Sequence, residues 1–156
     1  MAQILIADDE PKLGKLIVEM LAAAGHRAAH VTSGLAAIDW VKSTAPDILL
    51  TDLRMPDLDG LAVLREVKKL APATDVVIMT AHATAQNAVE AMRLGATDYL
   101  FKPFAMDELR MRIARIAERR DLATRANAFA KQLDQREGFG HVIADSSKMR
   151  AKASAA

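Results

Sequence analysis

The chain has 156 residues, 51% of them hydrophobic, so it can bury the core of one domain and carry a further segment. Its formal net charge of +1 argues against a nucleic-acid-binding surface, which usually needs a clustered basic face. The absence of cysteine excludes a disulfide framework and permits an intracellular setting. We see no signal peptide and no apolar run as long as a membrane span, so we expect a cytoplasmic protein without membrane contact.

The first part of the chain predicts two strands, each followed by a helix. An apolar run at residues 4–7 predicts a buried strand, and the next helix should end at Gly25. A weaker strand over residues 27–31 leads to a second helix that Thr32 or Ser33 can cap. The apolar face of the first helix is expected to comprise Leu13, Leu16, Ile17, Met20 and Leu21, and Trp40 is expected to pack in the second helix.

The same alternation continues through the rest of the chain and predicts an α/β fold. Five strands that alternate with helices should form a parallel sheet with helices on both faces. The remaining elements are expected to be a strand at 48–52, a helix at 61–70, a strand at 76–80, a helix at 84–94, a strand at 98–101 and a helix from 106.

Polar residues stand where four of the five expected strands end. Right-handed crossovers put the carboxyl ends of parallel strands on one edge of the sheet, where open α/β sheets bind ligands. We therefore expect these residues to converge on one crevice. They are Asp8 and Asp9, Asp52, Thr80 and Lys102.

This set of side chains is suited to receiving a phosphoryl group. Three neighbouring carboxylates repel one another unless a cation joins them, and ligation by oxygen alone suits Mg²⁺ before Ca²⁺ or Zn²⁺. Lys102 can place a positive charge, and Thr80 a hydroxyl donor, beside phosphate oxygens. Aspartate nucleophiles are known to form acyl phosphates. Asp52 is the natural acceptor, because Asp8 and Asp9 are needed for the ion.

Four short motifs resemble the receiver domain of two-component response regulators. The resemblance covers about residues 2–120. It implies a flavodoxin-like fold, a doubly wound five-stranded parallel sheet of order 2-1-3-4-5, here with an extended C-terminal linker helix. The motifs are Asp8-Asp9, Asp52-x-x-Met55-Pro56-x-x-x-Gly60, Thr80-Ala81 and Lys102-Pro103-Phe104.

The resemblance also implies a Mg²⁺-dependent phosphoacceptor rather than an enzyme with turnover. Asp52 would accept the phosphoryl group from a cognate sensor histidine kinase and lose it slowly. Mg²⁺ would be bound by Asp9, Asp52 and the backbone carbonyl of Arg54, with Asp8 helping through water.

Three further positions take their expected roles from the same resemblance. Thr80 and Lys102 would assist the reaction at the acceptor. Thr80 and Tyr99 would also form a switch pair, in which the hydroxyl moves toward the phosphate and the ring turns inward. The peptide bond between Lys102 and Pro103 would be cis.

Two stretches are similar to the enhancer-binding branch of response regulators, the NtrC-like activators of sigma-54 RNA polymerase. Residues 81–91 resemble that branch, and residues 139–150 look like the start of its AAA+ ATPase domain, although Ala144 and Asp145 depart from the usual Gly-Glu-Ser. No GxxxxGK[ST] loop follows, so we expect a chain truncated before the ATPase domain. DNA and polymerase would be reached only through domains outside it.

The last helix carries two apolar faces, which predict a dimer. Leu109, Ile113 and Ile116 continue the face that should pack on the sheet. The second face lies about 120° away, at ~100° per residue, so it should meet the same helix of a twin subunit. It comprises Leu122, Ala126, Phe129 and Leu133. The expected organisation is a receiver domain (1–120), a coiled-coil linker (121–137), and an ATPase start or disordered tail (138–156).

Other charged residues are expected to be structural. Asp57 and Asp59 should serve their loop and a helix cap. The four histidines have no partner at ligand spacing, so surface or packing roles are expected for all of them. They are His26, His30, His82 and His141.

Two alternative functions remain open at this point. A stand-alone receiver could act as a phosphate carrier or a protein-binding switch, and a Walker motif encoded downstream would decide against it. A phosphatase of the haloacid-dehalogenase kind also forms an aspartyl phosphate, but it needs an acid two residues after the nucleophile. That position is Arg54, so turnover of small phosphoesters is not expected.

Overall fold

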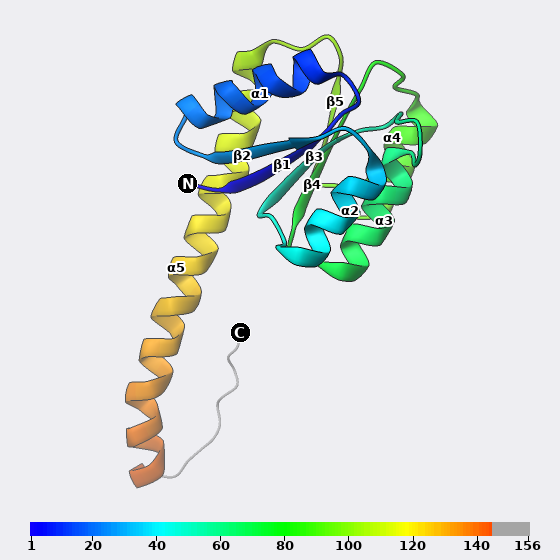
Figure 1. Cartoon of the computed structure of the whole chain (residues 1–156). Coiled ribbons are helices and arrows are strands. Elements are labelled where there is room, and N and C mark those ends of the chain that lie inside the picture. Colours follow the sequence, from blue (N-terminus) through cyan, green and yellow to red (C-terminus); the bar gives the residue numbers. More distant parts are fainter. Residues whose placement is uncertain (145–156) are drawn as a thin grey trace. The chain divides into compact units, whose positions relative to one another are not determined.

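The computed structural model describes residues 1–144, and the side chains of residues 1–133. Five parallel strands form one sheet in the order β2-β1-β3-β4-β5 (Figure 1). This confirms the predicted flavodoxin-like fold. The strands are β1 (Gln3–Ala7), β2 (Arg27–Val31), β3 (Ile48–Asp52), β4 (Asp75–Thr80) and β5 (Asp98–Phe101).

Helices cover both faces of the sheet. Helix α1 and the first turns of α5 lie on one face, and α2, α3 and α4 lie on the other (Figure 1). The chain divides into two compact units, Met1–Arg115 and Ile116–Ala156, and the sheet belongs to the first. The helices are α1 (Pro11–Ala23), α2 (Gly34–Ser43), α3 (Gly60–Leu70), α4 (Ala85–Arg93) and α5 (Met106–Ala144).

The core is centred on β3, the middle strand. All five of its residues are buried, and Leu49 and Leu50 are fully inaccessible. Strands β1 and β4 flank it and are buried over almost their whole length, as expected for a parallel sheet covered on both faces. The acidic residue that ends β3 is therefore held on the most buried strand of the sheet.

Local signals set the helix ends. Ser33, Asp59 and Thr84 each accept a hydrogen bond from a backbone N–H in the first turn of α2, α3 and α4. Gly25 and Gly95 follow α1 and α4 with φ of 94° and 104°, a conformation that favours glycine. Of the two residues proposed to cap the second helix, the structure therefore selects Ser33.

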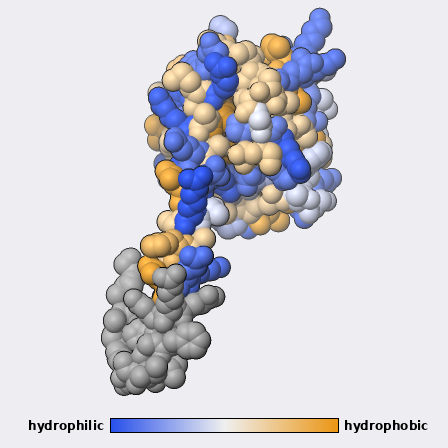
Figure 2. Space-filling view, turned by 90° about the vertical axis from the view of Figure 1, so that its left-hand side faces the viewer, coloured by the Kyte–Doolittle hydropathy of each residue, from blue (hydrophilic) through white to orange (hydrophobic). Residues whose placement is uncertain are grey.

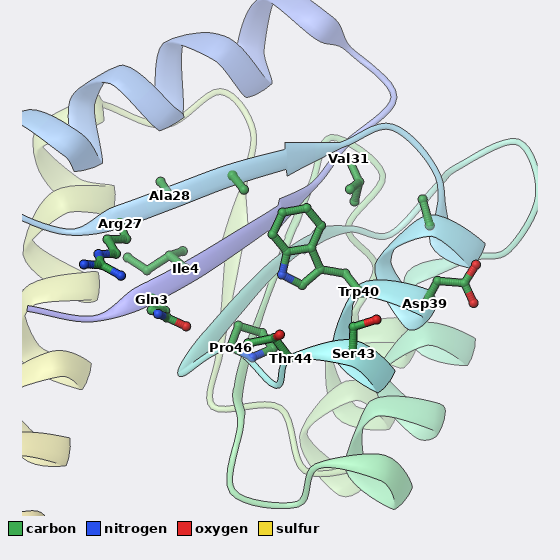
Figure 3. A pocket seen from close by; sticks show the side chains of 12 residues that line it. Gln3, Ile4, Arg27, Ala28, Val31, Asp39, Trp40, Ser43, Thr44 and Pro46 are labelled. Carbon is green, nitrogen blue, oxygen red and sulfur yellow. The ribbon is translucent and has the colours of Figure 1, made fainter.

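Two packing predictions are wrong. Leu16 was placed on the apolar face of the first helix, but its side chain is 49% exposed, while Ile17 and Leu21 carry the packing. Trp40 was expected to pack in the second helix, but it is 42% exposed. It borders a hollow of about 720 Å³ between α2 and the edge strand β2 (Figure 3).

Helix α5 continues without a break from Met106 to Ala144. Leu109 and Ile113 are fully buried, as predicted for the first apolar face. The predicted segment 138–156 begins inside α5, and residues 145–156 lie outside the described part. Within the described residues, no helix is both long and apolar enough to span a membrane.

The second face of α5 presents apolar residues on its surface. We call Leu122, Ala126, Phe129 and Leu133 the apolar stripe. Leu122 and Phe129 are 57% and 61% exposed, and Leu133 is 38% exposed. Apolar surface is visible beside charged residues on this described part of the helix in Figure 2.

Candidate functional site

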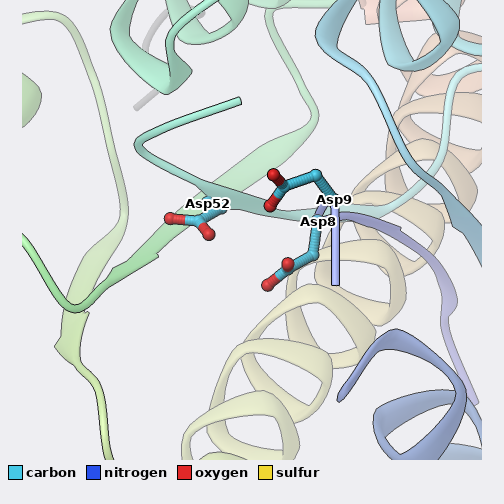
Figure 4. Close-up of side chains that lie close together, drawn as sticks. All are labelled: Asp8, Asp9 and Asp52. Atoms are coloured by element: carbon cyan, nitrogen blue, oxygen red, sulfur yellow. The ribbon is translucent and has the colours of Figure 1, made fainter. Parts of the chain in front are cut away.

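Three carboxylates lie together at the carboxyl edge of the sheet. Asp8 and Asp9 follow β1, and Asp52 ends β3 (Figure 4). One oxygen from each of the three groups lies within 4.8 Å of the others. Asp8 is fully buried and Asp52 is 7% exposed, whereas Asp9 is open to solvent. Asp52 follows Asp9 by 43 positions in the chain. The prediction that the carboxyl ends of parallel strands share one edge of the sheet therefore placed these remote residues together correctly.

Lys102 joins two of these carboxylates from the end of β5. Its Nζ atom lies 2.8 Å from Oδ2 of Asp8 and 3.0 Å from Oδ2 of Asp52. A longer contact of 3.6 Å reaches Glu10. Burial alone would lower the pKa of Lys102, but the hydrogen bonds to Asp8 and Asp52 outweigh it and raise this pKa above its usual value. The ammonium therefore stays charged throughout the physiological range.

Hydrogen bonds hold both the backbone and the side chain of Asp8. Its N–H donates to the carbonyl of Val31 at 3.1 Å, and its Oδ1 accepts from the N–H of Glu10 at 2.8 Å. Its carbonyl oxygen lies 2.8 Å from Nε2 of His30, on β2. His30 was expected to be an isolated packing residue. The pairing of β2 with β1 could have predicted that His30 lies near Asp8, because His30 stands opposite Ile6, two residues before Asp8.

Thr80 and Tyr99 lie on neighbouring strands. Thr80 is fully buried at the end of β4, and its Oγ1 accepts from the N–H of His82 at 2.9 Å. The Tyr99 hydroxyl is buried and, within the described part of the chain, has no hydrogen-bond partner. Burial raises the pKa of this phenol. Its ring meets that of Phe101 edge to face, with 5.6 Å between the ring centres.

The loop between β3 and α3 passes directly over Asp52. The N–H of Arg54 approaches Oδ1 of Asp52 at 3.3 Å. Gly60 donates to the carbonyl of Leu53 at 2.7 Å, and a Cβ at Gly60 would collide with the backbone of Asp52 and Leu53. Glycine is therefore required where α3 begins. Peptide geometry also agrees with expectation at the far side of the site, where the bond between Lys102 and Pro103 is cis.

Asp57 has a partner that its own loop did not suggest. Its two carboxylate oxygens accept from the N–H groups of Gly34 and Leu35, at the start of α2, at 3.0 and 2.9 Å. The hydrogen bond from Leu35 is the main cause that lowers the pKa of Asp57 from 3.8 to about 2. Asp59 caps α3, as expected. Neither residue belongs to the group of three carboxylates.

The electrostatics of the site fit a hard divalent cation. The three carboxylates and the Lys102 ammonium together leave two uncompensated negative charges. All side-chain donors are oxygens, and Asp9 is open to solvent, so bound water could complete the coordination. A pocket of about 380 Å³ adjoins Lys102 and the start of α1, whereas the hollow beside Trp40 contains none of these residues (Figure 3).

Comparisons with known proteins agree with this geometry. The model of the response regulator receiver domain family matches residues 4–114. The chain is 33% identical to the regulatory protein AtoC of Escherichia coli, over 94% of this chain and 32% of AtoC. It is 41% identical to the transcriptional regulatory protein ZraR of E. coli, over 68% of this chain and 24% of ZraR.

Another curated relative is the DNA-binding transcriptional regulator NtrC of E. coli, 40% identical over 67% of this chain and 22% of NtrC. The chain thus spans about a third or less of the length of these relatives. Solved structures agree: the receiver domain of a putative Luxo repressor protein from Vibrio parahaemolyticus has a TM-score of 0.75 at 29% identity, covering 79% of this chain and 95% of that chain. NtrX from Brucella abortus gives 0.75 at 32% identity, over 82% of this chain and 29% of that chain.

The family match covers more than half of the chain, and the acidic crevice lies within it. The chain therefore belongs to the response regulator receiver domain family and is related to the regulators AtoC, ZraR and NtrC.

Proposed function

We propose that this chain is a phosphorylation-controlled switch that receives a phosphoryl group on Asp52 from a sensor histidine kinase. The observation that carries the proposal is the placement of Asp52. Its carboxylate ends the central strand, lies 3.0 Å from the Lys102 ammonium and stands within 4.8 Å of two further carboxylates. A nucleophilic carboxylate, a fixed cation and a metal-binding group are the parts that acyl phosphate formation needs.

Mg²⁺ is the cofactor that this donor set favours. Asp9, Asp52 and the backbone carbonyl of Arg54 would hold the ion, and Asp8 would assist through water. When bound by these residues, the ion would supply positive charge to neutralise the phosphoryl oxygens. Asp8 is fully buried, and each of its two carboxylate oxygens accepts a hydrogen bond, from Glu10 and from Lys102, so it is better placed to orient the site than to act as acceptor.

The transfer itself makes one bond and breaks one. A carboxylate oxygen of Asp52 forms the new bond to phosphorus, while the bond from phosphorus to the donor's imidazole nitrogen breaks. The imidazole keeps the electron pair, and the product on Asp52 is an acyl phosphate. Lys102, held charged by its carboxylate neighbours, balances the negative charge that arrives with the phosphoryl group. Later attack of water on phosphorus regenerates Asp52 and releases phosphate.

Thr80 and Tyr99 are the proposed switch. The Thr80 hydroxyl accepts from the His82 backbone, and it can still donate to a phosphoryl oxygen. The Tyr99 hydroxyl is buried without a partner in the described residues, which costs about 1–3 kcal/mol relative to a satisfied group. A rearrangement that gives this hydroxyl a partner would be favoured by a similar amount, so Tyr99 is suited to respond to a movement of Thr80 on the neighbouring strand.

The output is proposed to pass through the helix beyond the receiver domain. The relatives AtoC and ZraR are described as regulatory proteins and NtrC as a transcriptional regulator, and each is about three times as long as this chain or longer. We propose that the chain controls an AAA+ ATPase and sigma-54 RNA polymerase on DNA through regions outside it. The apolar stripe would bring two subunits together as a homodimer.

Labelling with acetyl phosphate tests the central claim. Native chain in Mg²⁺ should form one base- and hydroxylamine-labile adduct, measured as a mass increase, and EDTA should prevent it. Asp52→Asn should form none, because an amide is not nucleophilic and is a poorer ligand. Asp59→Asn is the matched control: it changes another aspartate of the same loop, which caps α3, and should label normally. Full labelling of Asp52→Asn would refute the assignment.

A further inference from the structure

We propose that His30 is a positioning residue for the metal site, acting through the backbone of Asp8 rather than by contact with the ion. The inference rests on the proposed function, because it concerns the Mg²⁺ site. It starts from a hydrogen bond between His30 and the backbone of the acidic pair Asp8-Asp9 that follows β1. Nε2 of the half-buried imidazole lies 2.8 Å from the carbonyl oxygen of Asp8.

The direction of this hydrogen bond follows from its acceptor. A carbonyl oxygen can only accept, so Nε2 of His30 carries the hydrogen and donates it. The acceptor belongs to the peptide that links Asp8 to Asp9. On the other side of Asp8, its N–H donates to the carbonyl of Val31, so β2 holds both peptide groups of this residue. This second peptide contains the backbone nitrogen of Asp9, so the hydrogen bond from His30 restrains the position from which the Asp9 side chain extends.

Asp9 needs this external support more than its neighbours do. The carboxylates of Asp8 and Asp52 are held by Lys102, whereas Asp9 is exposed and follows the last residue of β1 by two positions. A metal site depends on groups that orient its ligands, and the loss of such a group commonly weakens the site. The imidazole supplies that orientation through the peptide plane.

A second observation concerns the place made for the ring. Gly14 is the fourth residue of α1 and is buried, and glycine within a helix is destabilising relative to alanine. A Cβ at Gly14 would collide with Nε2, Cε1 and Cδ2 of His30, the edge of the ring that bears the donor. The φ of Gly14 is not in the left-handed region, so the glycine serves close approach rather than a turn. Gly14 and His30 therefore act as a pair: one leaves the space, and the other places a donor in it.

The test measures Mg²⁺ affinity of the 156-residue chain by titration calorimetry, beside thermal unfolding of each variant. His30→Leu removes the donor and should weaken Mg²⁺ binding about tenfold, the lower end of losses seen when a ligand-orienting group is removed. His30→Gln keeps a side-chain N–H near the same reach and should stay within about threefold of native. His26→Leu is the matched control. It removes a histidine that contacts Ala2 just before the same strand, at the far end of β1, and should leave Mg²⁺ affinity unchanged.

Gly14→Ala gives an independent arm, since it keeps the imidazole but denies it its position. It should weaken Mg²⁺ binding severalfold, and it carries the test together with His30→Gln if His30→Leu does not fold. Native affinity in His30→Leu or in Gly14→Ala would overturn the inference, as would a His30→Gln variant as weak as His30→Leu. A native chain that binds no Mg²⁺ would instead overturn the proposed function, and the inference with it.

Discussion

The acidic crevice and the apolar stripe differ in where their partners lie. In the crevice, Asp8 and Asp52 are nearly or fully buried, and both are bonded to Lys102 from the same chain. In the stripe, Leu122 and Phe129 are more than half exposed. A polar site can be completed within one chain because hydrogen bonds satisfy its charges, whereas exposed apolar side chains are satisfied only by burial against something else. Lys102 thus holds two of the three crevice carboxylates within the chain, and a small cation can balance the remaining charge, whereas the stripe requires another protein surface.

The largest expected effect comes from a charge placed in the hydrophobic core of the first unit, in contrast to a charge on the exposed stripe. Ile113 lies on α5 but is fully buried within the first unit of the chain. Ile113→Glu would bury an unpaired carboxylate, so the free energy of unfolding should fall by at least about 3 kcal/mol. Urea denaturation followed by circular dichroism measures it. An unfolding midpoint close to native would mean that α5 does not complete the core.

A glutamate introduced on the apolar stripe should instead leave the fold intact. Phe129→Glu places a carboxylate where two subunits are proposed to meet, so dimerisation should weaken at least a hundredfold, or about 2.7 kcal/mol. Sedimentation velocity at micromolar concentration should find monomer, while the unfolding midpoint and the labelling of Asp52 stay native.

Exposed Phe101, at 61% exposure, supplies the control for that experiment. Phe101→Glu changes an equally exposed aromatic residue outside the stripe and should leave the dimer intact. If Phe129→Glu remains dimeric while Phe101→Glu does not, the subunits meet through the β5 side of the receiver domain. A native chain that is monomeric would leave the stripe for another partner.

A third variant tests whether phosphorylation in the acidic crevice changes dimerisation through the apolar stripe. Thr80→Ala removes the hydroxyl proposed to move toward the phosphoryl group, but it leaves Asp52 and Lys102 in place. Labelling should therefore continue, while the change in dimerisation on phosphorylation should shrink by about 1–3 kcal/mol, the usual size of such couplings. Sedimentation with and without beryllofluoride measures the difference. An undiminished response would show that the crevice signals by another route.

The smallest expected effect concerns a contact completed between distant segments. Asp57→Ala should lower the free energy of unfolding by about 0.5–1 kcal/mol at neutral pH, since it removes a solvent-exposed anion from the start of α2. The folded pKa is depressed, so this contribution is complete above the unfolded value of 3.8 and is lost as pH falls through about 2. Native and variant chains should thus converge in strongly acidic urea titrations. A constant gap would exclude the charge as its cause.

Much of the fold could be predicted because its signals are local. Apolar runs marked the strands, and the capping residues Ser33 and Asp59 indicated helix starts that the structure has. The crevice followed from one topological rule, since the ends of parallel strands share an edge. Asp8, Asp9, Asp52 and Lys102 could be brought together without any knowledge of side-chain geometry.

What could not be predicted depends on contacts between remote segments. Nothing in the sequence near Asp57 indicates that its partner is the start of α2, 22 or 23 positions earlier. His30 is isolated among the histidines, and its role depends on a carbonyl oxygen and on the space left by Gly14. Trp40 was expected to pack in the second helix, but α2 presents it at the border of a hollow instead. Periodicity identifies a face of a helix, but it does not say how far the neighbouring strand extends beneath it.

Gly60 couples the end of β3 directly to the start of α3. The first turn of α3 rests on the backbone of Asp52 and Leu53, with no side chain between the two segments, since any Cβ at Gly60 would overlap them. Most packed elements are separated by side chains that change rotamer and absorb small displacements. Here that compliance is missing, and the hydrogen bond from Gly60 to Leu53 adds stiffness. A displacement of the β3 end would therefore have to be accommodated by the first turn of α3 itself, since no side chain separates the two segments.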